Sequence, residues 1–286
     1  MLCATWGLQQ TAVKIANDGI APLLLVALRS IGGVALLMAW ARWRGVALFA
    51  RDGTLVPGLA AGVLFATEFA LIYLGLALTD AARGVLFLYT APFFVALGAH
   101  VFVPGDRLTA IKLAGLAAAF AGLVLALADG LSLPTRDEIA GDLLCLGGAA
   151  LWGATTVLIK ASRLARVSAE KTLFWQLGIA ALMLTPLSWL AGESWVVTLT
   201  PAVTAAFAFQ VVVVGFASYT AWFWLVRRYP ASLLSAFTFL TPVFGVAFGA
   251  LLLGERVGPL LLAALALIAL GVWLVNRPAS RAALRG

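Results

Sequence analysis

Charged residues are scarce in this sequence, at 11% of its 286 residues, whereas hydrophobic residues make up 63%. Ordinary soluble domains carry about 25% charged residues. The mean hydropathy of +1.06 is therefore far above what a domain folded in water shows. The composition indicates an all-α integral membrane protein with the lipid bilayer as its surroundings.

The residues of metal and nucleotide sites are almost absent as well. The chain has one histidine and two cysteines, and Cys3 and Cys145 follow no metal-ligand spacing. It has no Gly-rich phosphate loop ending in Lys and Ser/Thr, and no pair of carboxylates at a catalytic spacing. We therefore expect no metal, no cofactor, no enzyme activity and no direct use of ATP. Transport down a gradient remains, either facilitated or coupled to an ion.

Long apolar runs divide the chain into ten predicted membrane spans. A spanning helix needs about 20 mainly apolar residues to cross about 30 Å of hydrocarbon. The predicted spans, separated by Gly, Pro and charged residues, are 2–17, 21–41, 55–77, 81–103, 108–128, 140–161, 168–191, 200–226, 231–253 and 258–276.

Basic residues outnumber acidic ones by nineteen to twelve, a net charge of +7. In a soluble chain this excess would suggest nucleic-acid binding, but here the basic residues lie between apolar runs, so no nucleic-acid partner is expected. Cytoplasmic loops are enriched in Lys and Arg. With both termini in the cytoplasm, the inner segments hold fourteen basic residues and the outer ones four, namely Lys14, Arg83, Arg136 and Arg256. This bias predicts a multi-pass protein of a bacterial-type inner membrane with cytoplasmic N- and C-termini.

An internal repeat relates the two halves, predicted as residues 1–130 and 135–286. A shift of 146 residues aligns Trp6-Gly7 with Trp152-Gly153 without a gap. Because each half holds five spans, an odd number, the second half enters the membrane inverted. Such repeats place a substrate site in a central cavity near the midplane. Further matches, at shifts of 150 and 149, are Pro92 with Pro242 and Gly105-Asp106-Arg107 with Gly254-Glu255-Arg256.

Together these features resemble the drug/metabolite transporter superfamily over essentially the whole chain. The features are the ten spans, the Trp-Gly in the first span of each half, the proline in the fourth, and the Gly-Asp/Glu-Arg after it. Within the superfamily the chain is most similar to EamA-type exporters, in particular inner-membrane exporters of aromatic and other amino acids. The resemblance implies two inverted five-helix repeats that export a small-molecule substrate. The fold is similar to that of nucleotide-sugar and triose-phosphate translocators, which keeps those substrates open.

The first span of each half carries a polar stripe, because residues four apart share one helix face. Each stripe begins with a tryptophan that lies roughly 12 Å from the lysine at its other end, so both indoles approach the midplane from opposite sides. An indole offers a flat apolar face and one N–H donor to a solute such as an aromatic amino acid. We predict that both line a cavity; packing or the interfacial aromatic belt are the alternatives. The stripes are Trp6, Gln10 and Lys14, and Trp152, Thr156 and Lys160.

Glu68 and Arg29 are the ionisable residues that lie well inside predicted spans. Charged groups at such depth are costly and are read as functional by default. Glu68 is then a proton acceptor or a contact for a substrate ammonium group. The alternative is a structural ion pair between the two residues that holds the second and third spans together.

Pro92 and Pro242 lie in the middle of their predicted spans. Each removes a backbone hydrogen bond and clashes with the carbonyl four residues earlier, which predicts a kink or hinge suited to gating. A merely structural kink is the alternative. Tyr89, Gln176 and Tyr219 are further candidates to line the cavity. The small-residue stretches 115–122 and 263–271 predict close helix packing or the seam of a homodimer.

The sequence therefore predicts an alternating-access exporter of small amphiphilic metabolites, with amino acids, including aromatic ones, as the best match. A carrier of cationic or lipophilic drugs is one alternative, with Glu68 as the cation contact. A nucleotide-sugar or phosphate-ester antiporter is another, although it would need several Lys and Arg at mid-depth. A channel-like or lipid-handling protein is a third, and its polar stripes would face the lipid.

Overall fold

The computed structural model describes residues 1–128, 131, 133–253 and 261–277, and all regular elements within these ranges are helices. Seven segments are long and apolar enough to cross a membrane. Two shorter apolar helices and the first helix, Leu2–Asn17, bring the number of segments to ten. The helices are α1 (Leu2–Asn17), α2 (Pro22–Arg44), α3 (Leu55–Leu76), α4 (Ala81–Leu88), α5 (Ala91–Phe102), α6 (Ala110–Leu127), α7 (Arg136–Ala161), η2 (Arg163–Arg166), α8 (Ala169–Leu190), α9 (Pro201–Ala208), η3 (Phe209–Ser218), α10 (Tyr219–Arg228), α11 (Ala231–Phe237), α12 (Leu240–Leu253) and α13 (Leu261–Val275).

These helices form the ten membrane segments that the sequence predicts, and the all-α membrane fold is confirmed. Helix α7, which corresponds to the sixth predicted span, begins at Arg136 and not at the predicted residue 140. The fourth and ninth spans are each two helices, α4–α5 and α11–α12, and the eighth has a central π-helix, η3, between α9 and α10. The start of the predicted span 258–276 and the Gly254-Glu255-Arg256 motif lie outside the described residues.

Local sequence explains where several helices begin. Thr135 starts α7 with a capping box: its hydroxyl accepts a hydrogen bond from the Glu138 N–H, and the Glu138 carboxylate accepts one from the Thr135 N–H. Thr200 caps α9 through the Val203 N–H, and Pro201 takes the first helical position, where its missing N–H is not needed. In both helices the polar cap marks the residue at which the helix begins.

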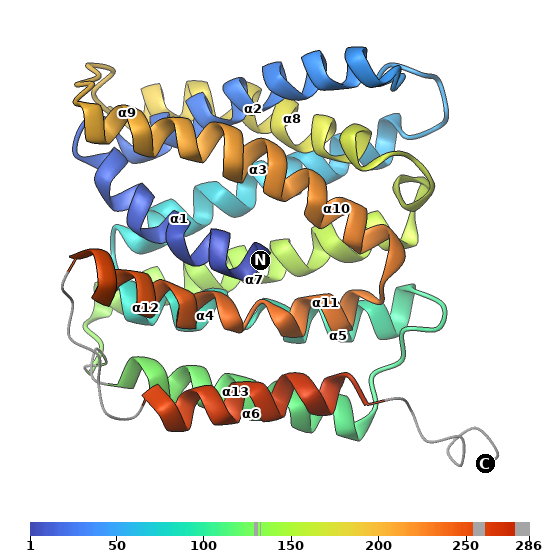
Figure 1. Ribbon diagram of the computed structural model, residues 1–286, viewed down its shortest axis with the longest axis vertical. Helices are drawn as coiled ribbons and strands as arrows, with labels where there is room; N and C mark the ends of the chain where they lie inside the picture. The colour runs from blue at the N-terminus through green and yellow to red at the C-terminus, as the bar shows by residue number, and fades with distance from the viewer. Residues whose placement is uncertain (129–130, 132, 254–260, 278–286) are drawn as a thin grey trace.

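The helices run roughly side by side and stack in layers (Figure 1). α2, α8 and α9 lie at one side of the stack, α6 and α13 lie at the opposite side, and α1 and α7 pass between them. The loops 45–54, 103–109, 162–168 and 229–230 lie at the end drawn on the right, called here the arginine-rich end. The loops 18–21, 77–80 and 191–200 lie at the other, arginine-poor end.

The first helix of each half packs against the broken fourth helix of the other half. A Cβ added to Gly7 on α1 would lie 2.5 Å from the Phe244 Cβ on α12. A Cβ added to Gly153 on α7 would lie 2.6 Å from the Phe94 Cβ on α5. Each phenylalanine follows its span's proline by two residues. The two contacts are therefore equivalent, as expected of inverted repeats, and each requires the glycine of the Trp-Gly pair.

The small-residue stretches 115–122 and 263–271 pack against each other, within one chain. A Cβ on Gly115 would lie 2.7 Å from the Gly271 carbonyl oxygen, and one on Gly122 would lie 2.7 Å from that of Ala264. α6 and α13 thus approach backbone to backbone. Packing within one chain accounts for the small residues of both stretches, and the homodimer stays a prediction.

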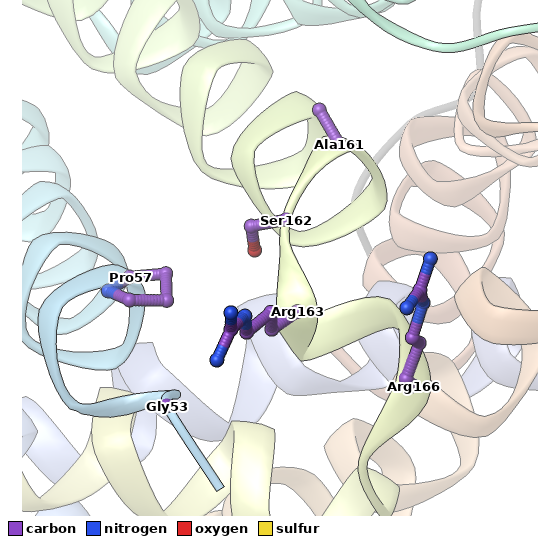
Figure 2. A pocket seen from close by; sticks show the side chains of 6 residues that line it. All are labelled: Gly53, Pro57, Ala161, Ser162, Arg163 and Arg166. Carbon is purple, nitrogen blue, oxygen red and sulfur yellow. The ribbon is translucent and has the colours of Figure 1, made fainter.

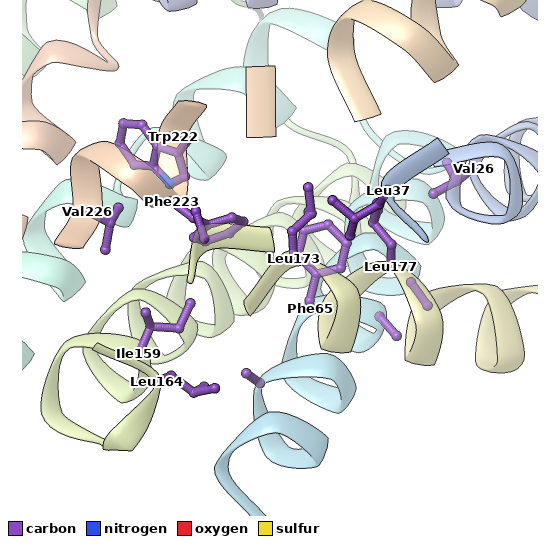
Figure 3. Packing of buried hydrophobic residues seen from close by; sticks show 14 of the residues in the cluster. Val26, Leu37, Phe65, Ile159, Leu164, Leu173, Leu177, Trp222, Phe223 and Val226 are labelled. Atoms are coloured by element: carbon purple, nitrogen blue, oxygen red, sulfur yellow. The ribbon is translucent and has the colours of Figure 1, made fainter. Parts of the chain in front are cut away.

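One hydrophobic cluster fills the space between α2, α3, α8 and α10 (Figure 3). Leu37, Leu173 and Leu177 are completely buried at its centre, and α10 contributes Trp222 and Phe223. A second cluster joins α4–α6 to α11–α13. The space between the two clusters is where α1 and α7 pass.

We predict that Gly271→Ala destabilises the protein by about 1–3 kcal/mol, because the new methyl group overpacks the helix contact. Its Cβ would lie 2.4 Å from the Gly115 carbonyl oxygen and 2.5 Å from the Ala119 nitrogen. Thermal unfolding of the detergent-solubilised protein measures the effect. Gly178→Ala is the matched control, because a Cβ on this α8 glycine meets no atom within 4 Å. Equal unfolding temperatures for the two variants would contradict the packing described.

Candidate functional site

A cavity of about 540 Å³ lies between the two hydrophobic clusters, and α1 and α7 form much of its wall. It brings together all seven residues that the sequence predicts as substrate contacts. Glu68 also lines it, whereas Arg29 and the two prolines do not. The lining residues are Trp6, Gln9, Gln10, Val13, Lys14, Asn17, Pro22, Phe65, Glu68, Phe69, Ile72, Tyr73, Leu76, Ala77, Val85, Leu88, Tyr89, Trp152, Thr155, Thr156, Gln176, Tyr219, Trp222, Phe223 and Thr241.

Trp6 is held in the wall by contacts from α10 and η3. Its indole N–H donates to the Ser218 hydroxyl over 2.9 Å. The Trp6 ring meets the rings of Tyr219 and Trp222 edge to face, at centroid distances of 6.3 and 5.2 Å. The edge-to-face contacts and the hydrogen bond to Ser218 hold this indole in place. Because its N–H already has an acceptor, the indole can contact a substrate mainly through its ring. Gln10, one turn further, lies against Gly245 of α12.

Trp152 occupies the related position on α7. Its ring meets that of Tyr89 edge to face at 6.3 Å. Thr155 and Thr156 line the cavity one turn further along, whereas Lys160 at the end of the predicted stripe does not. The stripe on α1 lines the cavity throughout, up to Lys14. The two stripes are thus unequal in the structure, although the sequence presents them as a pair.

Both fourth-span helices are interrupted, and neither is merely kinked. α4 ends at Leu88 and α5 begins at Ala91, so Pro92 occupies the first turn of α5. α11 and α12 separate in the same way before Pro242. The interrupted stretches bring Tyr89 and Thr241 into the cavity wall. The sequence placed each proline in mid-helix, whereas the structure puts the break two to four residues before it, where the ring can no longer clash with a continuous helix.

Glu68 and Arg29 are both buried, at 7% and 2% exposure. They act on each other electrostatically, but their contacts do not include a direct ion pair within 4.0 Å. The Arg29 guanidinium instead lies 4.8 Å from the Phe69 ring centroid and 5.8 Å from that of Tyr219. Its Nε and Nη2 have no hydrogen-bond partner among the described residues. Glu68 is therefore in the cavity wall, and Arg29 lies directly behind two aromatic rings of that wall.

Gln176 is the most deeply buried polar residue of the lining, with no exposed surface. Neither its amide nitrogen nor its amide oxygen finds a hydrogen-bond partner among the described residues. A buried amide left without partners costs about 1–3 kcal/mol.

Sequence reasoning missed several lining residues, chiefly Phe65, Phe69, Trp222 and Thr241. Phe65 and Phe69 lie on the face of α3 that also carries Glu68, so helical periodicity around the buried carboxylate was the available signal. Trp222 follows Tyr219 by three residues in the same way. Nothing in the pattern around Thr241 distinguishes it, because the break in the helix turns it toward the cavity.

The cavity extends to the arginine-poor end and is closed toward the arginine-rich end. Lys14 and Asn17 at the end of α1, and Ala77 after α3, line its mouth and are exposed. Toward the other end, Trp222 and Phe223 pack with Ile159 and Leu164 (Figure 3). One end of the cavity is thus continuous with the surface, and the other ends in packed side chains.

Polar contacts reinforce the closed end. The Asp106 carboxylate accepts hydrogen bonds from the Ser232 N–H, at 3.0 Å, from the Ser232 hydroxyl, and from the Lys112 ammonium, at 3.0 Å. Burial raises the pKa of Asp106, but these hydrogen bonds outweigh it and hold the pKa below its usual range. The Gly-Asp-Arg motif thereby caps the start of α11, and ties α6 to it.

Comparisons with known proteins agree with this architecture. The EamA-like transporter family model matches the chain twice, at residues 1–128 and 139–277. The chain belongs to the EamA-like transporter family. Both copies of the family unit in this EamA-like chain contribute helices to the wall of the cavity, and the chain is a multi-pass membrane protein with a transport role.

Relatives of this EamA-like chain cover nearly its full length. A probable amino-acid metabolite efflux pump of Escherichia coli (strain K12) is 27% identical over 96% of this chain and 92% of its own. An uncharacterised transporter of Bacillus subtilis (strain 168) is 23% identical over 94% of this chain and 92% of its own. A solved crystal structure, 24% identical, has a TM-score of 0.82 over 96% of this chain and 93% of its own, and therefore has the same fold.

Proposed function

We propose that this transporter is an alternating-access exporter of small amphiphilic metabolites, with amino acids, including aromatic ones, as its substrates. The observation that carries the proposal is the central cavity lined by helices of both family units, whose wall holds Trp6, Trp152 and the buried amide of Gln176. The protein moves its substrate without chemical change. The name of a relative supports this substrate class: the Escherichia coli relative is named a probable amino-acid metabolite efflux pump.

The lining suits a zwitterion that carries a ring or an aliphatic side chain. Aromatic faces supply most of the wall and bind the apolar part of a solute. Glu68 supplies an acceptor for an ammonium group, and Gln176 supplies a donor for a carboxylate. Among the described residues, Lys14 at the mouth is the single Lys or Arg in the lining. A phosphate ester would need several such cations at mid-depth, so the geometry disfavours a sugar-nucleotide antiporter.

We assign the arginine-rich end to the cytoplasm of a bacterial-type inner membrane, with both termini on that side, because Lys and Arg accumulate in cytoplasmic loops. The cavity mouth then faces outward, and the described conformation is the outward-facing one. Rocking of one repeat against the other would close the mouth and open the packed end around the same residues. Pro92 and Pro242, next to the breaks of the fourth and ninth spans, serve as the hinges of this movement.

A carrier of cationic drugs is the second candidate, and Glu68 is the observation that favours it. A buried carboxylate in an aromatic wall attracts a lipophilic cation with no carboxylate of its own. The two candidates differ in their need for Gln176. The carboxylate of an amino acid would accept a hydrogen bond from the Gln176 amide, whereas a cationic drug has no carboxylate to do so.

We expect Trp152→Ala to slow phenylalanine transport in proteoliposomes roughly two- to tenfold, because an aromatic contact contributes about 0.5–1.5 kcal/mol beyond buried area. The initial rate of labelled phenylalanine uptake measures the effect. Trp189→Ala is the matched control, since Trp189 is 69% exposed and outside the cavity. Normal rates for both Trp152→Ala and Trp6→Ala, with unchanged unfolding temperatures, would contradict a substrate site here.

With Glu68 proposed as the proton acceptor as well as the ammonium contact, we expect Glu68→Gln to abolish accumulation driven by a pH gradient, whereas exchange of labelled for unlabelled substrate slows but continues. The amide keeps the size of the side chain but carries no titratable proton. Flux with and without an imposed pH gradient is the measurement. Asp18→Asn removes an exposed carboxylate beyond the end of α1 and is the control. An unchanged response to the gradient in Glu68→Gln would remove its coupling role.

The assigned orientation predicts which positions react from outside the cell. In a chain with Cys3 and Cys145 replaced, Asn17→Cys at the mouth reacts with a membrane-impermeant maleimide in intact cells. Arg227→Cys, exposed at the arginine-rich end, reacts only after permeabilisation. The reverse pattern would show that the orientation is opposite.

A further inference from the structure

A second hollow, of about 500 Å³, lies at the arginine-rich end, separate from the central cavity. It is formed where the loop before α3 meets the turn after α7 (Figure 2). We call it the arginine cleft. Its lining residues are Gly53, Pro57, Ala161, Ser162, Arg163 and Arg166.

One wall of the arginine cleft is fixed by an ion pair. The Lys171 ammonium donates to the Asp52 carboxylate and to the Ala50 carbonyl, each over 2.7 Å. The Thr54 hydroxyl donates to the same carboxylate over 2.6 Å. These hydrogen bonds, that from Lys171 first, lower the pKa of Asp52 to about 2. The Asp52 carboxylate, next to Gly53 in the sequence, is therefore already paired with Lys171 and does not oppose an anion.

The other wall is the 3-10 turn η2, which carries both arginines. The Ser162 hydroxyl accepts a hydrogen bond from the Leu164 N–H at 3.2 Å, and Leu164 is completely buried in the hydrophobic cluster. The turn is thus anchored from below. Arg163 extends toward Gly53 and Pro57, whereas Arg166 rises from the other side of the turn (Figure 2).

Gly53 makes room for the Arg163 guanidinium. Its φ of +75° lies in the left-handed region that favours glycine. A Cβ at this position would lie 2.0 Å from the Arg163 Nη1. The guanidinium therefore rests on bare backbone and is held at the cleft, beside the first turn of α3. The positive end of that 22-residue helix adds to its field.

Neither arginine has an ion-pair partner in the part of the chain that the structure describes. The lining of the cleft thus includes two guanidinium groups that no carboxylate of the described residues neutralises. A guanidinium can bind a phosphate group through two parallel N–H···O hydrogen bonds. Leu55 and Val56, at the start of α3, are 59% and 76% exposed next to it. A cationic cleft bordered by exposed aliphatic side chains suits the boundary where lipid headgroups meet hydrocarbon.

We propose that the arginine cleft binds the phosphodiester headgroup of an anionic membrane lipid, with Arg163 as the main contact and Arg166 as the second. The acyl chains lie along Leu55 and Val56. Basic pockets between membrane helices are known to hold such headgroups. The site is independent of the central cavity and of what that cavity transports.

Native mass spectrometry of the purified full chain in neutral detergent, titrated with phosphatidylglycerol, tests the proposal. We expect a saturable bound lipid in the unaltered protein. Binding weakens about fivefold for each arginine removed, so about 25-fold in Arg163→Gln/Arg166→Gln. Arg163→Lys/Arg166→Lys, which keeps both charges, retains more of the affinity than the glutamine pair.

The matched control is Arg42→Gln/Arg227→Gln, which removes two exposed arginines of the same end outside the cleft. Equal weakening in the control and in the cleft variant would show general surface attraction and overturn the proposal. So would equal binding of phosphatidylcholine. Glycerol phosphate and inorganic phosphate form a further arm, and displacement of the lipid by either at equal concentration would assign the cleft to a soluble phosphate instead. Unfolding temperatures of all variants in neutral detergent separate loss of binding from loss of fold.

Discussion

The close contact between each Trp-Gly helix and the broken helix of the opposite half is the constraint on which the rest of the structure depends. Lipid gives helices no hydrophobic reason to associate, so close backbone packing must supply the attraction. Gly7 lets α1 approach Phe244, and Gly153 lets α7 approach Phe94. These contacts hold the two family units together across the middle of the molecule, and they place each neighbouring tryptophan beside the space that the units enclose.

The enclosed space in turn explains the polar residues that lipid would not tolerate. Glu68 and Gln176 are buried within membrane helices, yet both line the cavity. Arg29 lies behind the rings of Phe69 and Tyr219, which shield its charge through their faces. A cavity with an aromatic wall and a few unsatisfied polar atoms is a poor packed core but a good site for a solute that brings its own polar groups.

The two ends of the molecule carry different polar contacts. At the arginine-rich end, the Asp106 carboxylate and the packing around Trp222 hold the cavity shut. The same end carries Arg163 and Arg166, outside the packed region and next to exposed aliphatic side chains. At the arginine-poor end, Arg83 pairs with Asp142 and Thr79 donates to the same carboxylate, which joins α4 to α7 beside the mouth. Polar clusters thus brace both membrane surfaces, whereas the middle is left to aromatic contacts.

The sequence by itself determined the membrane class, the ten segments and the polar faces of α1 and α7, because hydropathy and helical periodicity are local properties that a bilayer amplifies. It also singled out Glu68 as a buried charge at membrane depth, but left open whether it faces a solute or pairs with Arg29. Only the tertiary structure decided that Arg29 stands behind the wall without a direct ion pair, that Lys160 leaves the cavity while Lys14 lines it, and that the fourth spans break before their prolines. It alone showed that the small-residue stretches 115–122 and 263–271 meet each other. These outcomes depend on which helices become neighbours and at what distance, and no single helix encodes that.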